Sequence, residues 1–217
     1  MIGQQPVQAS QQGLTFPSQC LGEFLSRLDR VDPHPAVLDL GIVCGDNISF
    51  LGQRGCRVCV ESFPSMVSLA LPVQPKNGKA PAAPAQPQAP LSKTLSCLRF
   101  PSETFSGVLA WDAISRVPPD RAVEFVDSLR RMMLWGGVLL AYFPWAATVS
   151  AQITGRYRIL GTGQLVIEPA NGHHPRITHY QNREIYAMFA RMDIIRISQL
   201  KSGAREVLVA RSRKEAF

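Results

Sequence analysis

The segment Ala36–Asn47, with the sequence AVLDLGIVCGDN, constrains the fold of this chain more than any other. An apolar run leads into an acidic residue, then into a turn with two spaced glycines, and then into a stretch typical of a helix. Glycines let a backbone approach a ligand closely, and the start of a helix offers unpaired N–H groups. The segment therefore predicts the first strand, ligand loop and helix of a nucleotide-type α/β sheet.

The next apolar run, Arg57–Glu61, ends on a carboxylate. Glu61 lies about 20 residues beyond the glycine turn, which is where an acidic side chain can accept hydrogen bonds from the hydroxyls of a ribose. The sequence thus predicts a nucleoside-type ligand held between the loop and Glu61.

Strand and helix patterns alternate along the rest of the chain. Apolar runs predict further strands, and helical periodicity predicts helices, of which the longest should end near Gly136 and Gly137. The expected strands are 95–98, 107–111 and 138–143, and the expected helices are 17–28, 46–53, 64–71, 118–134 and 182–190. Two β-rich runs, 193–200 and 205–211, should form an antiparallel hairpin. We expect an α/β fold with a doubly wound, mostly parallel sheet and a C-terminal antiparallel hairpin.

The 217 residues suit one domain, which we place at 17–217. Residues 1–16 are rich in Gln, Ser and Gly and are expected to be a flexible lead-in. Residues 72–90 are of Pro/Ala/Gln low complexity and cannot build a core. Because the sheet pattern resumes after them, we interpret 72–90 as a surface insertion within the domain.

The formal net charge of +7 leaves an acidic partner open, with basic residues gathered at Arg130–Arg131 and near the C-terminus. The basic residues are not interleaved with a regular array of aromatics, so nucleic acid binding is not supported. Residues 132–151 are uncharged and mostly apolar. Gly136, Gly137 and Pro144 interrupt this stretch, so we expect no membrane span.

Five cysteines, an odd number without the spacing of a secreted scaffold, indicate reduced thiols and a cytoplasmic protein. Cys56 and Cys59 form a CxxC pair. They lie at and within an expected strand, and no second pair follows, which favours core packing over zinc binding. We expect no metal site.

The order of these elements and their local sequences resemble the class I S-adenosylmethionine-dependent methyltransferases. Val37–Gly41 (VLDLG) looks like the first motif of that family, and Glu61 looks like its ribose-binding acid. The stretch 98–112 is similar to the approach to strand four, and Leu134–Leu140 is similar to the turn into strand five. The resemblance runs from Ala36 to Phe143, with support from the C-terminal hairpin.

The resemblance implies S-adenosylmethionine as the cofactor, with the loop after strand one around its methionine end and Glu61 on its ribose. The implied cofactor-binding residues are Asp39, Gly41, Gly45, Glu61 and Trp111. Trp111 and Asp112 end strand four and would face the methyl-transfer cleft. Methyl transfer needs alignment more than proton transfer, so Asp112 is only a weak candidate for a catalytic base.

The sequence also departs from the family pattern. Val43 stands where the middle glycine usually lies, Thr94 and Ser106 stand where acids are common, and Arg116 stands where histidine is frequent. Two functions stay open. The first, which we favour, is a methyltransferase for an unidentified acceptor. The second is a non-catalytic scaffold or assembly protein with lost or weakened cofactor binding and a protein partner. A dehydrogenase fits less well because the full G-x-G-x-x-G is absent.

Overall fold

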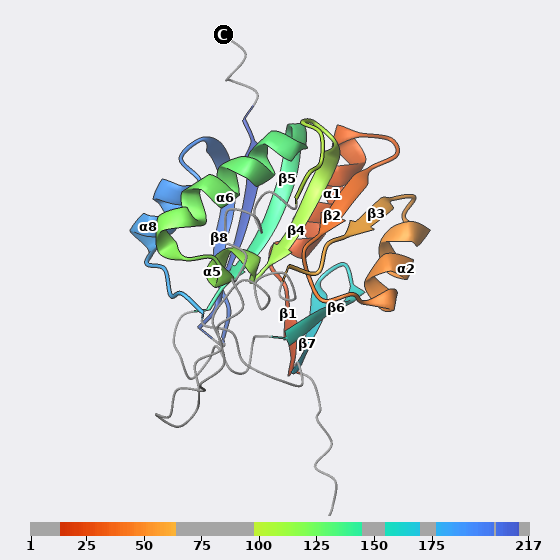
Figure 1. Cartoon of the computed structure of the whole chain (residues 1–217). Helices are drawn as coiled ribbons and strands as arrows, with labels where there is room; N and C mark the ends of the chain where they lie inside the picture. The colour runs from red at the N-terminus through yellow and green to blue at the C-terminus, as the bar shows by residue number, and fades with distance from the viewer. Residues whose placement is uncertain (1–13, 64–97, 145–154, 170–176, 202, 213–217) are drawn as a thin grey trace, which may run out of the picture.

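The computed structural model describes residues 14–63, 98–144, 155–169, 177–201 and 203–212, which fold around a six-stranded sheet (Figure 1). In spatial order its strands are β3 (Arg57–Val60), β2 (Ala36–Asp39), β4 (Phe105–Trp111), β5 (Met133–Phe143), β9 (Arg205–Arg211) and β8 (Met192–Gln199). The first four are parallel, and β9 and β8 run antiparallel to their neighbours. The predicted fold class is therefore confirmed.

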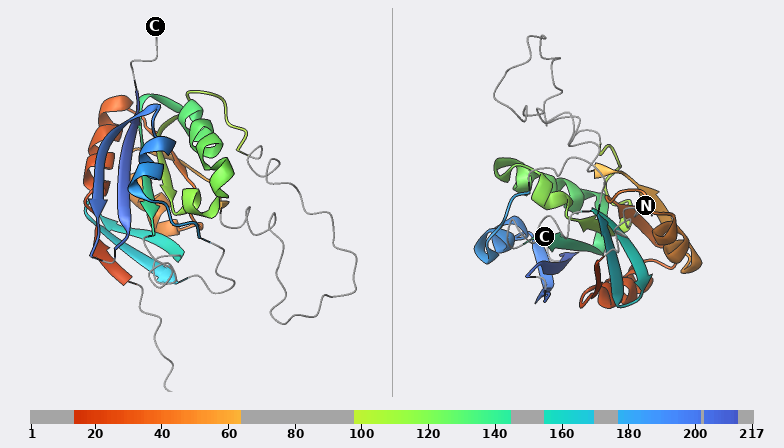
Figure 2. Two further views of the ribbon diagram at one scale, coloured as in Figure 1. Left: turned by 90° about the vertical axis from the view of Figure 1, so that its left-hand side faces the viewer. Right: turned by 90° about the horizontal axis from the view of Figure 1, so that it is seen from below.

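Helices cover both faces of this sheet, as Figure 2 shows for α1 and α6. The helices on the two faces are α1 (Leu21–Val31) and α2 (Gly45–Gln53) on one side, and α5 (Ala113–Arg116), α6 (Pro119–Met132) and α8 (Asn182–Met188) on the other. Side chains alternate along each strand, so Val108 of β4 belongs to the core under α6 and Leu109 to the core under α1. The sheet thus separates two apolar cores.

The packing of α1 against β4 depends on Gly107. A Cβ atom at Gly107 would lie 2.4 Å from Leu28 Cδ2 and 2.9 Å from Phe24 Cζ, both in α1. The missing side chain therefore lets the helix approach the strand closely. The predicted helix is confirmed, although it begins at Leu21 rather than at Pro17.

A second, three-stranded sheet lies at the carboxyl ends of the parallel strands (Figure 1). It consists of β1 (Leu14–Pro17), β7 (Gln164–Pro169) and β6 (Gly155–Gly161), all antiparallel. Residues 14–16 of the expected lead-in belong to β1, so that expectation was wrong for these three residues. The reason is a long-range pairing with β7, which also brings Phe16 against the ring of Tyr142. Residues 1–13 lie outside the described residues.

The glycine pair Gly136–Gly137 does not end a helix. Helix α6 stops at Met132, and both glycines lie inside β5. Gly136 has a φ of 78°, and a Cβ at Gly137 would lie 2.9 Å from the carbonyl oxygen of Leu134. The pair forms an irregularity within the strand. The sequence-based prediction failed here because a bulge and a helix end both select glycine.

Some expectations fall outside the described residues: the helix at 64–71, the insertion at 72–90 and nearly all of the strand at 95–98. The short helix α5 was not predicted. Among the residues that the structure describes, no helix has the length and apolar character needed to cross a membrane.

Candidate cofactor site

The carboxyl ends of β2, β3 and β4 bring together Asp39, Glu61 and Trp111, three of the residues predicted from the sequence. The backbone N–H of Glu61 donates to the carbonyl oxygen of Asp39 at 2.8 Å, which extends the pairing of β2 with β3. Ligands of open α/β sheets bind at this edge. The two carboxylates therefore lie where the sequence placed the ligand.

Asp39 is buried and its carboxylate is engaged. Its Oδ1 atom accepts a hydrogen bond from the backbone N–H of Gly41 at 2.8 Å and another from Trp111 Nε1 at 2.6 Å. Burial raises the pKa of Asp39, and hydrogen bonds from Gly41, Trp111 and Asn47 offset part of that effect. The carboxylate of Asp39 is thus occupied by hydrogen bonds from N–H groups of the same chain.

The indole of Trp111 lies against Gly41. A Cβ atom at Gly41 would be 2.8 Å from Trp111 Cδ1 and 2.9 Å from Trp111 Nε1, which is closer than real Cβ contacts. Glycine is required here, but the group that makes the close approach is an internal ring. At Gly45, the first residue of α2, a Cβ would meet no described atom within 4 Å. The two predicted glycines therefore differ in their surroundings.

Trp111 has an unusual backbone conformation, and its ring is stacked against other aromatic rings. Its φ of 46° is left-handed, a conformation that non-glycine residues rarely adopt and that costs about 1–2 kcal/mol. Its ring stacks on Tyr157 with centroids 4.8 Å apart and on Tyr142 with centroids 5.9 Å apart. Neither tyrosine was predicted to belong to the site.

Asn47 fastens β6 over the first turn of α2. Its Nδ2 donates to the carbonyl oxygen of Tyr157 at 2.9 Å, and its Oδ1 accepts from the backbone N–H of Ile159 at 2.8 Å. Asn47 is buried, so these bonds satisfy polar groups that water does not reach. The result is that Tyr157 is fixed against Trp111.

Tyr142 is fixed at its hydroxyl. Tyr142 Oη donates to Glu206 Oε1 at 2.6 Å, and Glu206 Oε2 accepts from the backbone N–H groups of Gln19 at 2.7 Å and Cys20 at 3.1 Å. Burial raises the pKa of Tyr142, and the neighbouring carboxylate of Glu206 raises it further. The aromatic stack is thus anchored to the start of α1.

Asp112, the weak candidate for a base, forms a buried bidentate ion pair. Its two carboxylate oxygens accept from Arg116 Nε at 2.9 Å and from Arg116 Nη2 at 2.6 Å. Burial lowers the pKa of Arg116, but the charge of Asp112, its hydrogen bonds with Arg116 and a smaller contribution of Tyr157 together outweigh this and raise the pKa overall. Arg116, noted in the sequence as a departure, is the partner of Asp112.

Glu61 is half-buried and differs from both aspartates. Its carboxylate makes no hydrogen bond or ion pair with the residues that the structure describes. Its position, one residue beyond β3, is the one predicted for a group that accepts from ribose hydroxyls. Val43, another departure, has an exposed side chain and is not among the described residues with positive φ.

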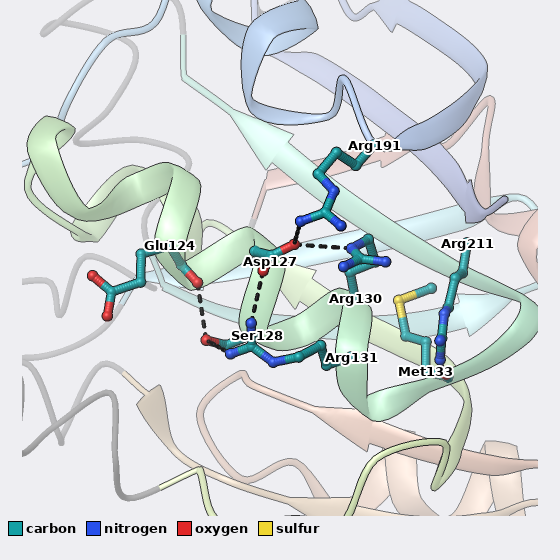
Figure 3. Close-up of polar contacts among 8 residues, drawn as sticks. All are labelled: Glu124, Asp127, Ser128, Arg130, Arg131, Met133, Arg191 and Arg211. Carbon is teal, nitrogen blue, oxygen red and sulfur yellow. Dashed lines mark hydrogen bonds and ion pairs between the residues drawn. The ribbon is translucent and has the colours of Figure 1, made fainter. Parts of the chain in front are cut away.

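Three of the basic residues considered for nucleic acid binding, Arg130, Arg131 and Arg211, make contacts within the chain (Figure 3). Asp127 accepts from Arg130 at 2.9 Å and from Arg131 at 2.7 Å. Arg211 lies over the ring of Trp135 at 3.8 Å and is 8% exposed at its side chain. These arginines therefore have structural roles within the chain, and their contacts add no support for nucleic acid binding.

The CxxC pair lies at the start of β3 and within it. Burial raises the pKa of the Cys56 and Cys59 thiols. Over the described ranges no group of three or more His, Cys, Asp or Glu side chains could hold a metal ion.

Comparison with solved structures gives the fold a context. The complex between the Haloferax volcanii Trm112 methyltransferase activator and a methyltransferase matches with a TM-score of 0.50 and 12% identity, over 88% of this chain and 88% of that chain. The fold is that of the class I S-adenosylmethionine-dependent methyltransferases. No protein-family model and no curated protein sequence matches this chain.

Two further structures have TM-scores just below 0.5. A methyltransferase from Methanosarcina mazei matches at 0.48 with 14% identity, over 85% of this chain and 95% of that one. The 1,6-didemethyltoxoflavin-N1-methyltransferase of Burkholderia thailandensis matches at 0.47 with 15% identity, over 90% of this chain and 79% of that one. The Burkholderia structure holds S-adenosylhomocysteine. At these identities the likeness concerns the fold alone.

The residues fit S-adenosylmethionine, the predicted cofactor, at one end of the site. Glu61 suits the ribose, because its carboxylate can accept hydrogen bonds and has no described partner. At the methionine end, Asp39 and Gly41 are both in contact with Trp111. The methionine end therefore does not fit while the indole keeps this position.

Proposed function

We propose that this chain binds S-adenosylmethionine at the carboxyl ends of β2, β3 and β4 and transfers a methyl group to an acceptor that is not identified. The observation that carries this proposal is Glu61, whose backbone is fixed to Asp39 while its carboxylate has no described partner. The class I methyltransferase fold supports the proposal. We further expect a cytoplasmic protein, as the odd number of cysteines indicates.

The chemistry asks little of the chain's own acids and bases. The cofactor supplies a methyl group that is already activated, so the protein's task is to bind, orient and exclude water. The engagement of Asp112 by Arg116 therefore does not oppose methyl transfer. In this proposal Glu61 positions the ribose, and the loop with Gly41 and Gly45 receives the methionine end after Trp111 has moved.

A second candidate is the non-catalytic scaffold, and one observation favours it. Trp111, Asp39 and Tyr157 form a closed set of internal contacts at the place where a methyltransferase needs its cofactor. If this arrangement were permanent, the sheet would serve as a structural module and the partner would be another protein.

The test is a titration of the full chain with S-adenosylhomocysteine, followed by calorimetry and thermal shift. A specific site stabilises the fold by about 2.7 kcal/mol at a hundredfold excess of ligand over Kd. We expect Glu61→Gln to abolish the shift. Glu124→Gln, which changes an exposed carboxylate on α6, should keep it. No shift at millimolar ligand would favour the scaffold, and an unchanged shift in Glu61→Gln would place the ligand elsewhere.

A further inference from the structure

We propose that Trp111 determines which part of an adenosine-type ligand this site admits. In the described conformation its indole occupies the place expected for the amino-acid tail of S-adenosylmethionine, while the carboxylate of Glu61 makes no hydrogen bond or ion pair with a described residue. The ligand class that this arrangement favours is a purine nucleoside with a short 5′ substituent, such as 5′-methylthioadenosine. This inference rests on the proposed location of the cofactor.

A single indole engages both groups expected at the tail. Its Nε1 donates to Asp39 Oδ1 at 2.6 Å, and its five-membered ring is within 3 Å of the place where a Cβ of Gly41 would lie. A ligand atom that reached the backbone of Gly41 would therefore meet the ring first. A ligand that ended at the ribose would meet neither.

The indole is not a loosely placed side chain. Trp111 is 1% exposed and lies parallel to Tyr157, with an angle of 15° between the ring planes. Tyr157 is held in turn by Asn47 through its carbonyl oxygen. The left-handed φ of Trp111 is a conformation that persists only where the surroundings determine it. Displacing the ring requires these contacts to open together.

These contacts predict an unusual order of affinities. S-adenosylhomocysteine differs from 5′-methylthioadenosine by its amino-acid tail, and a tail that met a prepared pocket would raise the affinity. Here the tail has to displace the stacked and hydrogen-bonded indole of Trp111. The free energy that the tail gains from its contacts is therefore offset by the cost of moving the indole. The wild-type chain should therefore bind S-adenosylhomocysteine no more tightly than 5′-methylthioadenosine.

The experiment compares both ligands by calorimetry in the wild type, in Trp111→Ala and in the control Trp135→Phe. In Trp111→Ala, S-adenosylhomocysteine should gain at least tenfold over 5′-methylthioadenosine. In Trp135→Phe the ratio should equal that of the wild type. If Trp111→Ala does not fold, Trp111→Phe removes the N–H bond to Asp39 and should shift the ratio in the same direction by a smaller factor.

A second measurement follows the ring itself. In a variant with Trp135→Phe and Trp145→Phe, Trp111 is the only tryptophan of the chain. Its emission should stay unchanged with saturating 5′-methylthioadenosine and change with saturating S-adenosylhomocysteine, because only the tail displaces the ring.

The outcomes separate this inference from the proposed function. A wild-type chain that binds S-adenosylhomocysteine at least tenfold more tightly than 5′-methylthioadenosine, with unchanged Trp111 emission, would overturn the role of Trp111 and leave the proposed function standing. Binding of neither ligand by the wild type or the variants would overturn both.

Discussion

Asp39 and Glu61 lie at the ends of neighbouring parallel strands, yet their carboxylates have different surroundings. Asp39 is buried and accepts from Gly41 and Trp111, whereas Glu61 is half-buried and has no partner among the described residues. The same edge of one sheet thus holds a carboxylate that accepts hydrogen bonds from the chain and a carboxylate that accepts none from the described residues. What separates them is the supply of internal N–H donors, which the loop and Trp111 provide on one side only.

Removing the indole should have the largest effect on stability. Trp111→Ala deletes a buried ring that stacks on two tyrosines, and we expect the free energy of unfolding to fall by about 3–5 kcal/mol. Guanidinium unfolding measures this loss, and Trp111→Phe should lose less. A loss below about 1 kcal/mol for the alanine variant would mean that the ring is not fixed as described.

Loosening β6 should have the next largest effect. Asn47→Ala leaves the carbonyl oxygen of Tyr157 and the N–H of Ile159 without their partner, at a cost of about 1–3 kcal/mol. Hydrogen exchange at the amides of β6 should speed up. Asp46→Ala, on the same helix but exposed, is the control and should change stability by less than about 0.5 kcal/mol. Equal effects of the two variants would contradict the role of Asn47.

The buried carboxylate should also give stability a dependence on pH. Burial raises the pKa of Asp39 in the folded state above the ordinary value of 3.8. The protonated carboxyl group of Asp39 is therefore favoured more strongly in the folded chain than in the unfolded chain. The contribution of Asp39 to stability therefore falls as pH rises from 3.8 through the raised folded pKa.

Asp39→Asn removes this ionisation and keeps an oxygen that can accept from Gly41 and Trp111. The stability of Asp39→Asn relative to the wild type should rise over that pH window. Urea unfolding from pH 3.5 to about 7 measures the difference. If the difference in the free energy of unfolding between Asp39→Asn and the wild type stayed constant with pH, the pKa of Asp39 would not be raised by burial.

The smallest effect on folding is expected on the open side of the site. Glu61→Gln should alter the free energy of unfolding by less than about 0.5 kcal/mol, because the carboxylate has no described partner to lose. Thermal unfolding without ligand measures this. A large loss would show that Glu61 is a structural group like Asp39, and the contrast between the two would disappear.

Local patterns were enough to predict much of the sheet. The apolar run from Ala36 to Asp39 and the apolar periodicity of α1 and α6 could be recognised because their residues are close together in the sequence. The pairing of β8 with β9 was predicted from a short joint. In contrast, both a bulge and a helix end select glycine, and only the pairing of β5 with β4 decides for Gly136.

The internal contacts of the site were not predictable in the same way. The bond from Asn47 to Tyr157 joins residues 110 positions apart, and nothing near Tyr157 in the sequence indicates it. The direction of the Trp111 ring depends on a left-handed backbone and on tyrosines from two other strands. The family resemblance implies that Trp111 lies at the site, but only tertiary packing decides whether its ring faces a ligand or takes the place of one.

The bond between Glu206 and the start of α1 has a consequence for biosynthesis. Glu206 Oε2 and the N–H of Gln19 are separated by 187 positions, and β9, which carries Glu206, inserts between β5 and β8. A ribosome releases the first helix long before it makes this acceptor. The core therefore cannot be completed before β9 has emerged from the ribosome, and we expect the insertion of β9 between β5 and β8 to be a late step of folding.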